Sequence, residues 1–207
     1  MGTFRIKQGA HFHRVPPVST LPWLGEQSMQ RHVTFDESCR YGSVPYHRQD
    51  VNKLFGLSFG LLPHRLETVQ LAGPSTIGRA YTTHKWVSAL HWNSARFGWR
   101  WNPTNQCIEL LAYVYNNGVR NQDAQMNFPV VLQVKPGEKV WCHIGATFDH
   151  ESGIPVYEFS AIAPGQRGGS KDVLRPDKLP GYGLTHGLYF GGSLPAPHEM
   201  SVTLDRN

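Results

Sequence analysis

The sequence predicts an all-β protein, a two-sheet antiparallel β-sandwich of the jelly-roll or concanavalin-like kind. The 207 residues include 21 Gly and 15 Pro, which interrupt long helices. From Asn52 onward, short runs of alternating apolar residues follow one another and are separated by turn residues. No stretch of about 12 residues without Gly or Pro shows the apolar period of a helix.

The strands follow from this alternation. Within residues 1–50 only 31–35 alternates, so we expect an irregular N-terminal arm or edge strand packed on one domain that spans 1–207. A helix of at most two turns is expected around 63–70, and 163–180 is expected to be a long loop. Further strands are predicted at 54–62, 85–90, 95–101, 108–115, 130–134, 139–148, 156–162, 188–190 and 200–204.

Three turns join these runs into hairpins. Asn117-Gly118 supplies the residues with positive φ that a tight hairpin needs. Pro136-Gly137 has the order that a type II turn requires, and Gly153 closes a third bend. Consecutive antiparallel hairpins of this kind are typical of a β-sandwich.

Composition and charge exclude several classes of protein. The sequence is 40% hydrophobic with no apolar run of the ~18 residues that a membrane-spanning helix needs. The 20 Lys and Arg exceed the 15 Asp and Glu by five, but they form no basic stripe, so we do not expect a nucleic-acid partner. A modest positive charge is compatible with an anionic ligand such as an acidic sugar.

No cofactor or metal site is predicted. Cys39, Cys107 and Cys142 lack metal-ligand spacing and are expected to be buried thiols. His11 and His13 stand without a nearby carboxylate, and Asp149 to Glu151 lacks the calcium-loop pattern. The first ten residues carry no targeting signal, so the compartment stays open, and a removed signal peptide would leave the same sequence.

The functional interpretation rests on the side chains of the predicted strands that point away from the core. Side chains alternate across a strand, so each run divides into two faces. The face that a core does not need collects aromatic residues with polar tips beside Arg, Glu and His. Its members are Arg96, Arg100, Glu109, Tyr113, Tyr115, Trp141 and His143. Aromatic rings stack on sugar rings, and the charged groups bond hydroxyls or carboxylates. We therefore expect a lectin-like, carbohydrate-binding face.

Two alternatives stay open. A polysaccharide lyase that acts on an acidic glycan needs a His or Tyr base, a Tyr acid and a group that neutralises the uronate carboxylate, which His143, Tyr113, Tyr115 and Arg96 match in type. A glycoside hydrolase needs two carboxylates, and Glu109 stands alone on this face. Alternatively, loops or the arm cover the face in a structural or interaction domain, with Arg96 and Glu109 as a cross-strand ion pair.

Three stretches carry a family resemblance. They are Asn52-Lys53-Leu54-Phe55-Gly56 in the first motif, Asn93-Ser94-Ala95-Arg96-Phe97-Gly98-Trp99-Arg100 in the second and Tyr189-Phe190-Gly191-Gly192 with Ala196-Pro197-His198 in the third. The sequence resembles a group of bacterial domains of the Bacteroidetes type that look like concanavalin-like jelly rolls. The resemblance implies the fold and carries no assigned activity or catalytic residue. Physically, these Gly, Pro and Asn residues are suited to rigid bends and turns.

Overall fold

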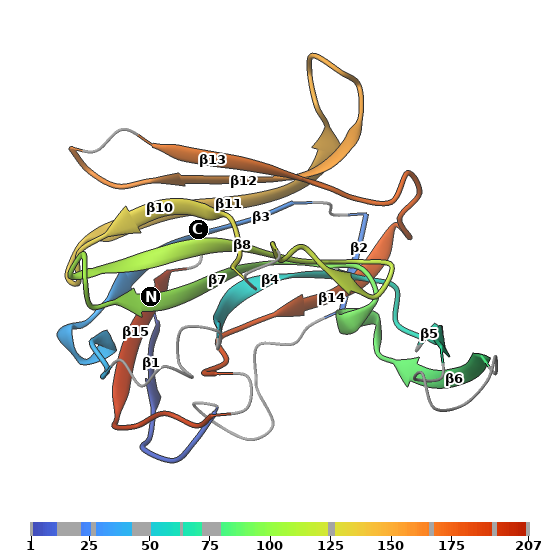
Figure 1. The fold of residues 1–207 in the computed structure, drawn as a ribbon. Coiled ribbons are helices and arrows are strands. Elements are labelled where there is room, and N and C mark those ends of the chain that lie inside the picture. The colour runs from blue at the N-terminus through green and yellow to red at the C-terminus, as the bar shows by residue number, and fades with distance from the viewer. Residues whose placement is uncertain are drawn as a thin grey trace.

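The chain folds into a sandwich of two antiparallel β-sheets, as the sequence predicts, and Figure 1 shows the sheets as stacked layers. The structure, a computed structural model, describes residues 2–11, 22–25, 28–42, 51–62, 64–71, 80–123, 127–165, 168–191 and 194–205. Among these residues no helix has the length and apolarity needed to cross a membrane.

The first sheet, here called the β11 sheet, has six strands. In spatial order they are β1 (Gly2–Ile6), β15 (Met200–Asp205), β3 (Ser28–Phe35), β11 (Lys139–Phe148), β12 (Pro155–Ile162) and β13 (Gly169–Leu174). The second sheet, called the β7 sheet, has seven. They are β10 (Val130–Val134), β8 (Cys107–Asn116), β7 (Ser94–Asn102), β4 (Asn52–Phe59), β14 (Tyr182–His186) and β2 (Pro22–Leu24), with β9 (Val119–Arg120) on β8.

A separate hairpin and two short 3₁₀ helices complete the described elements. The hairpin of β5 (His64–Leu71) and β6 (Ala80–Val87) forms its own two-stranded sheet and stands away from the sandwich in Figure 1. The 3₁₀ helices are η1 (Glu37–Cys39) and η3 (Ala89–His91).

The core lies between the two sheets and follows the predicted alternation. Phe97 and Trp99 of β7 and Leu110 and Ala112 of β8 are buried in it, and Ile144 of β11 comes from the opposite sheet. The opposite positions on β7 and β8 therefore lie on the outer face of the β7 sheet. All three cysteines are buried and unpaired, and burial raises the pKa of the Cys39 thiol to about 12.

The predicted turns are confirmed, because Asn117, Gly118 and Gly137 have φ of 49°, 81° and 88°. The predicted helix around 63–70 is wrong, since β5 occupies that segment and pairs along its length with β6. Local pattern cannot show such a partner strand.

Three further segments differ from expectation. The predicted loop 163–180 contains β13, and 188–190 makes only an isolated bridge through Tyr189 to Lys53. The N-terminal segment is less irregular than expected. Its strand β3 lies inside the β11 sheet between β15 and β11, while β1 forms the edge of that sheet.

Candidate functional site

The candidate site is built around Arg96, in the middle of the outer face of the β7 sheet. In the strand register Arg96 stands opposite Tyr113 of β8 on one side and Gly56 of β4 on the other. Gly56 in turn stands opposite His186 of β14. Directly opposite residues project from the same face, so His186, Gly56, Arg96 and Tyr113 form one row across four strands.

Gly56 gives the Arg96 side chain its place in this row. A Cβ atom at residue 56 would lie 2.7 Å from Cγ of Arg96 and 2.6 Å from its Cα, closer than such atoms approach in folded proteins. We expect Gly56→Ala to push Arg96 out of position and to lower the free energy of unfolding by about 1–3 kcal/mol. Denaturant unfolding measures this loss, and an unchanged midpoint would show that Gly56 is not needed for packing.

Arg96 is a buried cation that has no counter-ion among the residues the structure describes. The residue is 7% exposed, its Nε has no hydrogen-bond partner, and no described carboxylate forms an ion pair with it. Burial lowers its pKa to about 10, and Tyr113, Tyr115 and Tyr189 act in the opposite direction. The guanidinium is therefore charged at neutral pH. Because an unpaired buried charge is costly, this arrangement favours an anionic ligand.

Two tyrosines of β8 lie beside Arg96. Tyr113 is 6% exposed and Tyr115, two residues further along β8, is half-buried on the same face, with ring centroids 5.8 Å apart. Burial, and secondarily Tyr115, raises the pKa of Tyr113 well above its usual range. Tyr113 is therefore a protonated hydroxyl near neutral pH, suited to donate a proton or a hydrogen bond.

Lys53 brings a second cation to the cluster. Its Nζ lies 5.0 Å from the ring centroid of Tyr113 and 5.6 Å from that of Tyr189, and it donates a 3.1 Å hydrogen bond to the carbonyl of Gly191. The backbones of Lys53 and Tyr189 exchange two hydrogen bonds of 2.8 Å. Asn52 accepts a 2.6 Å bond from the Gly191 N–H, so β4 anchors segment 189–191 beside the cluster.

Two histidines lie near the row, His186 beyond Gly56 of β4 and His91 against Tyr115. Nε2 of His186 is 2.7 Å from the Ser58 hydroxyl, and burial, together with the charges of Arg96 and His91, lowers the pKa of His186 to about 3. Its imidazole is therefore neutral at physiological pH. The His91 ring lies 5.3 Å from that of Tyr115. From here on, the Arg96 cluster means Lys53, Arg96, Tyr113, Tyr115 and Tyr189.

Arg100 and Glu109 belong to a different arrangement on the same face. Arg100 Nε donates to Glu109 at 2.7 Å, and the Asn102 and Gln133 amides donate to the same carboxylate at 2.7 Å and 3.2 Å. Burial raises the Glu109 pKa, but these donors outweigh burial and lower it overall. The predicted Arg96–Glu109 ion pair is wrong, because Glu109 stands opposite Arg100 in the register.

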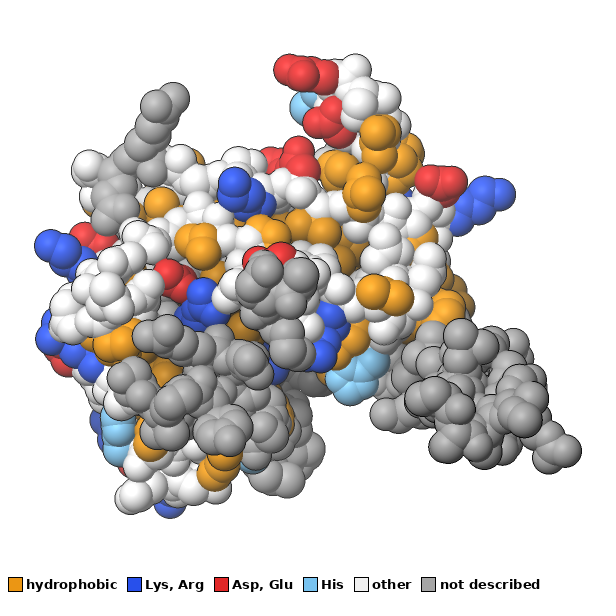
Figure 2. Space-filling view, in the orientation of Figure 1, with side chains coloured by type: hydrophobic (Ala, Val, Ile, Leu, Met, Phe, Trp, Pro, Cys, Tyr) orange, Lys and Arg blue, Asp and Glu red, His pale blue; other side chains and the backbone are white. Residues whose placement is uncertain are grey.

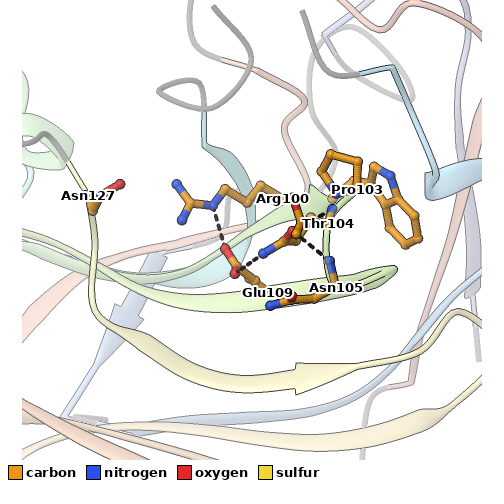
Figure 3. Close-up of a pocket in the computed structure, with 8 residues that line it drawn as sticks. Arg100, Pro103, Thr104, Asn105, Glu109 and Asn127 are labelled. Atoms are coloured by element: carbon orange, nitrogen blue, oxygen red, sulfur yellow. Dashed lines mark hydrogen bonds and ion pairs between the residues drawn. The ribbon is translucent and has the colours of Figure 1, made fainter. Parts of the chain in front are cut away.

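Glu109 and Arg100 line a pocket together with Asn127, and Figure 3 shows Arg100 bonded to Glu109 and Asn127 apart from them. The pocket volume is about 360 Å³. A small apolar cluster that includes Val51, Leu111 and Phe128 lies on the same face, and the Phe128 ring is 4.6 Å from that of Tyr113. Part of the outer face is thus covered by packed residues, as the structural alternative expects.

Trp141 and His143 do not join this site. They lie on β11, which pairs with β3 and β12 in the other sheet, so the prediction that all seven candidate residues share one face is wrong. Their rings are parallel within 3° at 5.8 Å, on the outer face of the β11 sheet. Strand alternation gives the face of each residue but not the sheet to which the strand belongs. Arg96, Arg100, Glu109, Tyr113 and Tyr115 do share the outer face of the β7 sheet.

Two residues of the Arg96 cluster are not among those predicted from the alternation of side chains. Lys53 and Tyr189 lie within the first and third family-like motifs, where we expected structural roles for Gly, Pro and Asn. His198, another motif residue, bonds the Ser38 carbonyl at 2.7 Å. Among the described residues, no group of three or more His, Cys, Asp or Glu is placed to hold a metal ion.

Figure 2 shows Lys and Arg side chains interspersed with acidic and uncharged ones on the face in view.

The sequence matches no family model and no curated protein sequence. Among solved structures, the chain is similar to the marine PL-14 alginate lyase from Aplysia kurodai, with 14% sequence identity and a TM-score of 0.47. The likeness covers 98% of this chain and 79% of that one.

Proposed function

We propose that this protein is a polysaccharide lyase that cleaves an acidic glycan by β-elimination beside a uronate. The single observation that carries the proposal is the buried Arg96 guanidinium, which has no carboxylate partner among the described residues and lies beside Tyr113 and Tyr115 of β8. A uronate carboxylate supplies the missing counter-ion, and a guanidinium binds it through two parallel hydrogen bonds. Neutralising that carboxylate makes the neighbouring C5 proton more acidic.

The tyrosine pair supplies the proton transfers. In the reaction the C5–H bond breaks and its proton goes to the Tyr115 oxygen, whose own hydroxyl proton passes to the hydrogen-bonded Tyr113. The electron pair forms the C4=C5 double bond, the C4–O bond breaks, and the leaving oxygen takes a proton from Tyr113. Tyr113 is suited to the acid role because burial keeps its hydroxyl protonated. Lys53, over the Tyr113 ring, adds positive charge beside the carboxylate.

Hydrolysis is disfavoured by the state of Glu109. A glycoside hydrolase needs a protonated carboxylic acid and a second carboxylate close to it. Glu109 instead accepts bonds from Arg100, Asn102 and Gln133, which hold its pKa below the usual range, so it remains an anion. β-Elimination with Tyr113 as the acid needs no protonated carboxylic acid.

Activity should depend on pH through Arg96. Burial lowers the Arg96 pKa to about 10, so the free enzyme carries the cation below that pH and loses it above. We therefore expect kcat/KM, which reports ionisations of the free enzyme, to fall as the pH rises through about 10. Circular dichroism at each pH separates this fall from unfolding. A kcat/KM that stays level to pH 11 in the folded protein would contradict the role of Arg96.

The lyase proposal is tested by incubation with alginate, polygalacturonate and glycosaminoglycans. A lyase creates an unsaturated uronide at each new non-reducing end, which absorbs in the ultraviolet. We expect this absorbance with at least one polymer. Binding without cleavage would leave the cluster as a lectin-like site for acidic glycans, and new reducing ends without absorbance would indicate hydrolysis.

A further inference from the structure

A second cation, Arg120, stands beside the Arg96 cluster. β9 pairs with β8 so that Arg120 lies directly opposite Tyr115, and it therefore projects from the same outer face. Arg120 is exposed, and no described residue forms an ion pair or hydrogen bond with its guanidinium. Burial raises the pKa of Tyr113, and the charge of Arg120 acts in the opposite direction, which places this charge near the tyrosine pair.

The separation of the two arginines suits two linked sugars. Arg120 is two strands from Arg96 and two residues further along the strand direction. Strand spacing and rise per residue put their Cα atoms about 12 Å apart. Arg120 has a long, exposed side chain, so its guanidinium can reach a carboxylate on the pyranose ring next to the one at Arg96.

A pocket of about 430 Å³ adjoins Arg120. Its lining includes the amides of Asn116 and Asn121, the apolar side chains of Val119 and Leu174, and Asp172 on the β13 side. Asn121 is held in place, because its amide accepts from the Val114 N–H at 2.8 Å and donates to the Ala112 carbonyl at 3.0 Å. The pocket itself lies towards β13, because its lining residues Asn116 and Val119 alternate with Tyr115 and Arg120. The bonds of Asn121 to β8 fix the neighbouring Arg120 beside Tyr115.

We infer that Arg120 is a specificity-determining residue that binds the carboxylate of the sugar next to the one held by Arg96. The inference rests on the proposed lyase function and adds to it a requirement on the substrate. A chain with acidic sugars in adjacent positions engages both arginines. A chain in which acidic and neutral sugars alternate engages Arg96 alone.

The test measures binding without turnover. We would titrate oligogalacturonates and oligoalginates of two to six units into Tyr113→Phe protein by calorimetry, and then into Tyr113→Phe with Arg120→Gln. We expect Arg120→Gln to weaken binding of the longer oligomers about tenfold, the size of one charge-assisted contact, and to leave binding of a single uronic acid unchanged. Lys135→Gln, another exposed cation in the β10–β11 turn, should change neither affinity.

Each outcome decides a different point. Equal affinities of the two proteins for every oligomer would overturn the role of Arg120. An equal loss for the monosaccharide and the longer oligomers would also overturn it, because Arg120 would then not act on a neighbouring sugar. Absence of unsaturated product from the wild-type protein would instead overturn the lyase proposal, and the calorimetric comparison does not depend on turnover.

A second readout uses substrate choice in the active protein. In the wild type we expect a higher kcat/KM on a polymer of contiguous uronates than on an alternating acidic polymer. Arg120→Gln should lower the ratio of kcat/KM on the contiguous polymer to kcat/KM on the alternating polymer. The change should come from a higher KM for the contiguous polymer with kcat largely retained, because Arg120 binds away from the reacting bond. An unchanged ratio would contradict the inference.

Discussion

Replacing Arg96 with Met should abolish activity and make the protein more stable. No described carboxylate pairs with the buried guanidinium, so an apolar side chain of similar length removes an unpaired charge. We expect the free energy of unfolding to rise by about 1–3 kcal/mol and kcat/KM to fall by at least about 10²-fold. Denaturant unfolding and the ultraviolet assay measure the two effects on the same preparation.

Arg175 provides the matched control. It is buried to 8% exposure, similar to Arg96, but its guanidinium donates to the carbonyls of Thr147, Pro176 and Asp177. Arg175→Met leaves those carbonyls without their donor, so it should lower stability and retain activity. If Arg96→Met destabilised the protein as much as Arg175→Met does, Arg96 would be a structural residue with satisfied contacts.

The second large effect concerns Tyr113. Tyr113→Phe removes the hydroxyl that donates the proton to the leaving oxygen, and keeps the ring that packs on Phe128 and under Lys53. We expect kcat to fall by about 10²–10⁴-fold while KM and the unfolding midpoint change little. The measurement is the initial rate of absorbance increase over a range of polymer concentrations.

Tyr157 is the control for this substitution. Its hydroxyl is buried in the core without a hydrogen-bond partner, and burial raises its pKa as it does that of Tyr113. Tyr157→Phe should retain full activity, and its free energy of unfolding should be the same as in the wild type or higher. Retention of more than about a tenth of kcat by Tyr113→Phe would exclude Tyr113 as the general acid.

Local sequence pattern was sufficient for much of the fold. The predicted run 139–148 has the same bounds as β11, because turn residues close it at both ends, and its alternation places Val140, Cys142 and Ile144 in the core. The same alternation placed Arg96, Tyr113 and Tyr115 on one face away from the core, since their neighbours Phe97 and Ala112 are buried. Periodicity within one strand needs no knowledge of its partners.

The sequence pattern could not predict which strands pair with one another. Trp141 and His143 were assigned to the face of Arg96, yet β11 pairs with β3 and β12. Lys53 and Tyr189 meet through a bridge between segments far apart in the chain, which no local pattern reports. The resemblance to bacterial jelly-roll domains stays a prediction, although each of its three motifs contributes a residue to the cluster, namely Lys53, Arg96 and Tyr189.

The decisive experiment for the lyase proposal compares the products of an acidic polysaccharide treated with the wild-type, Arg96→Met and Tyr113→Phe proteins. Ultraviolet absorbance and mass spectrometry of the products are measured together. We expect oligomers with an unsaturated uronide at the new end from the wild type, formed at least about 10²-fold more slowly by each variant. Saturated oligomers, or unsaturated product formed equally by all three proteins, would contradict it.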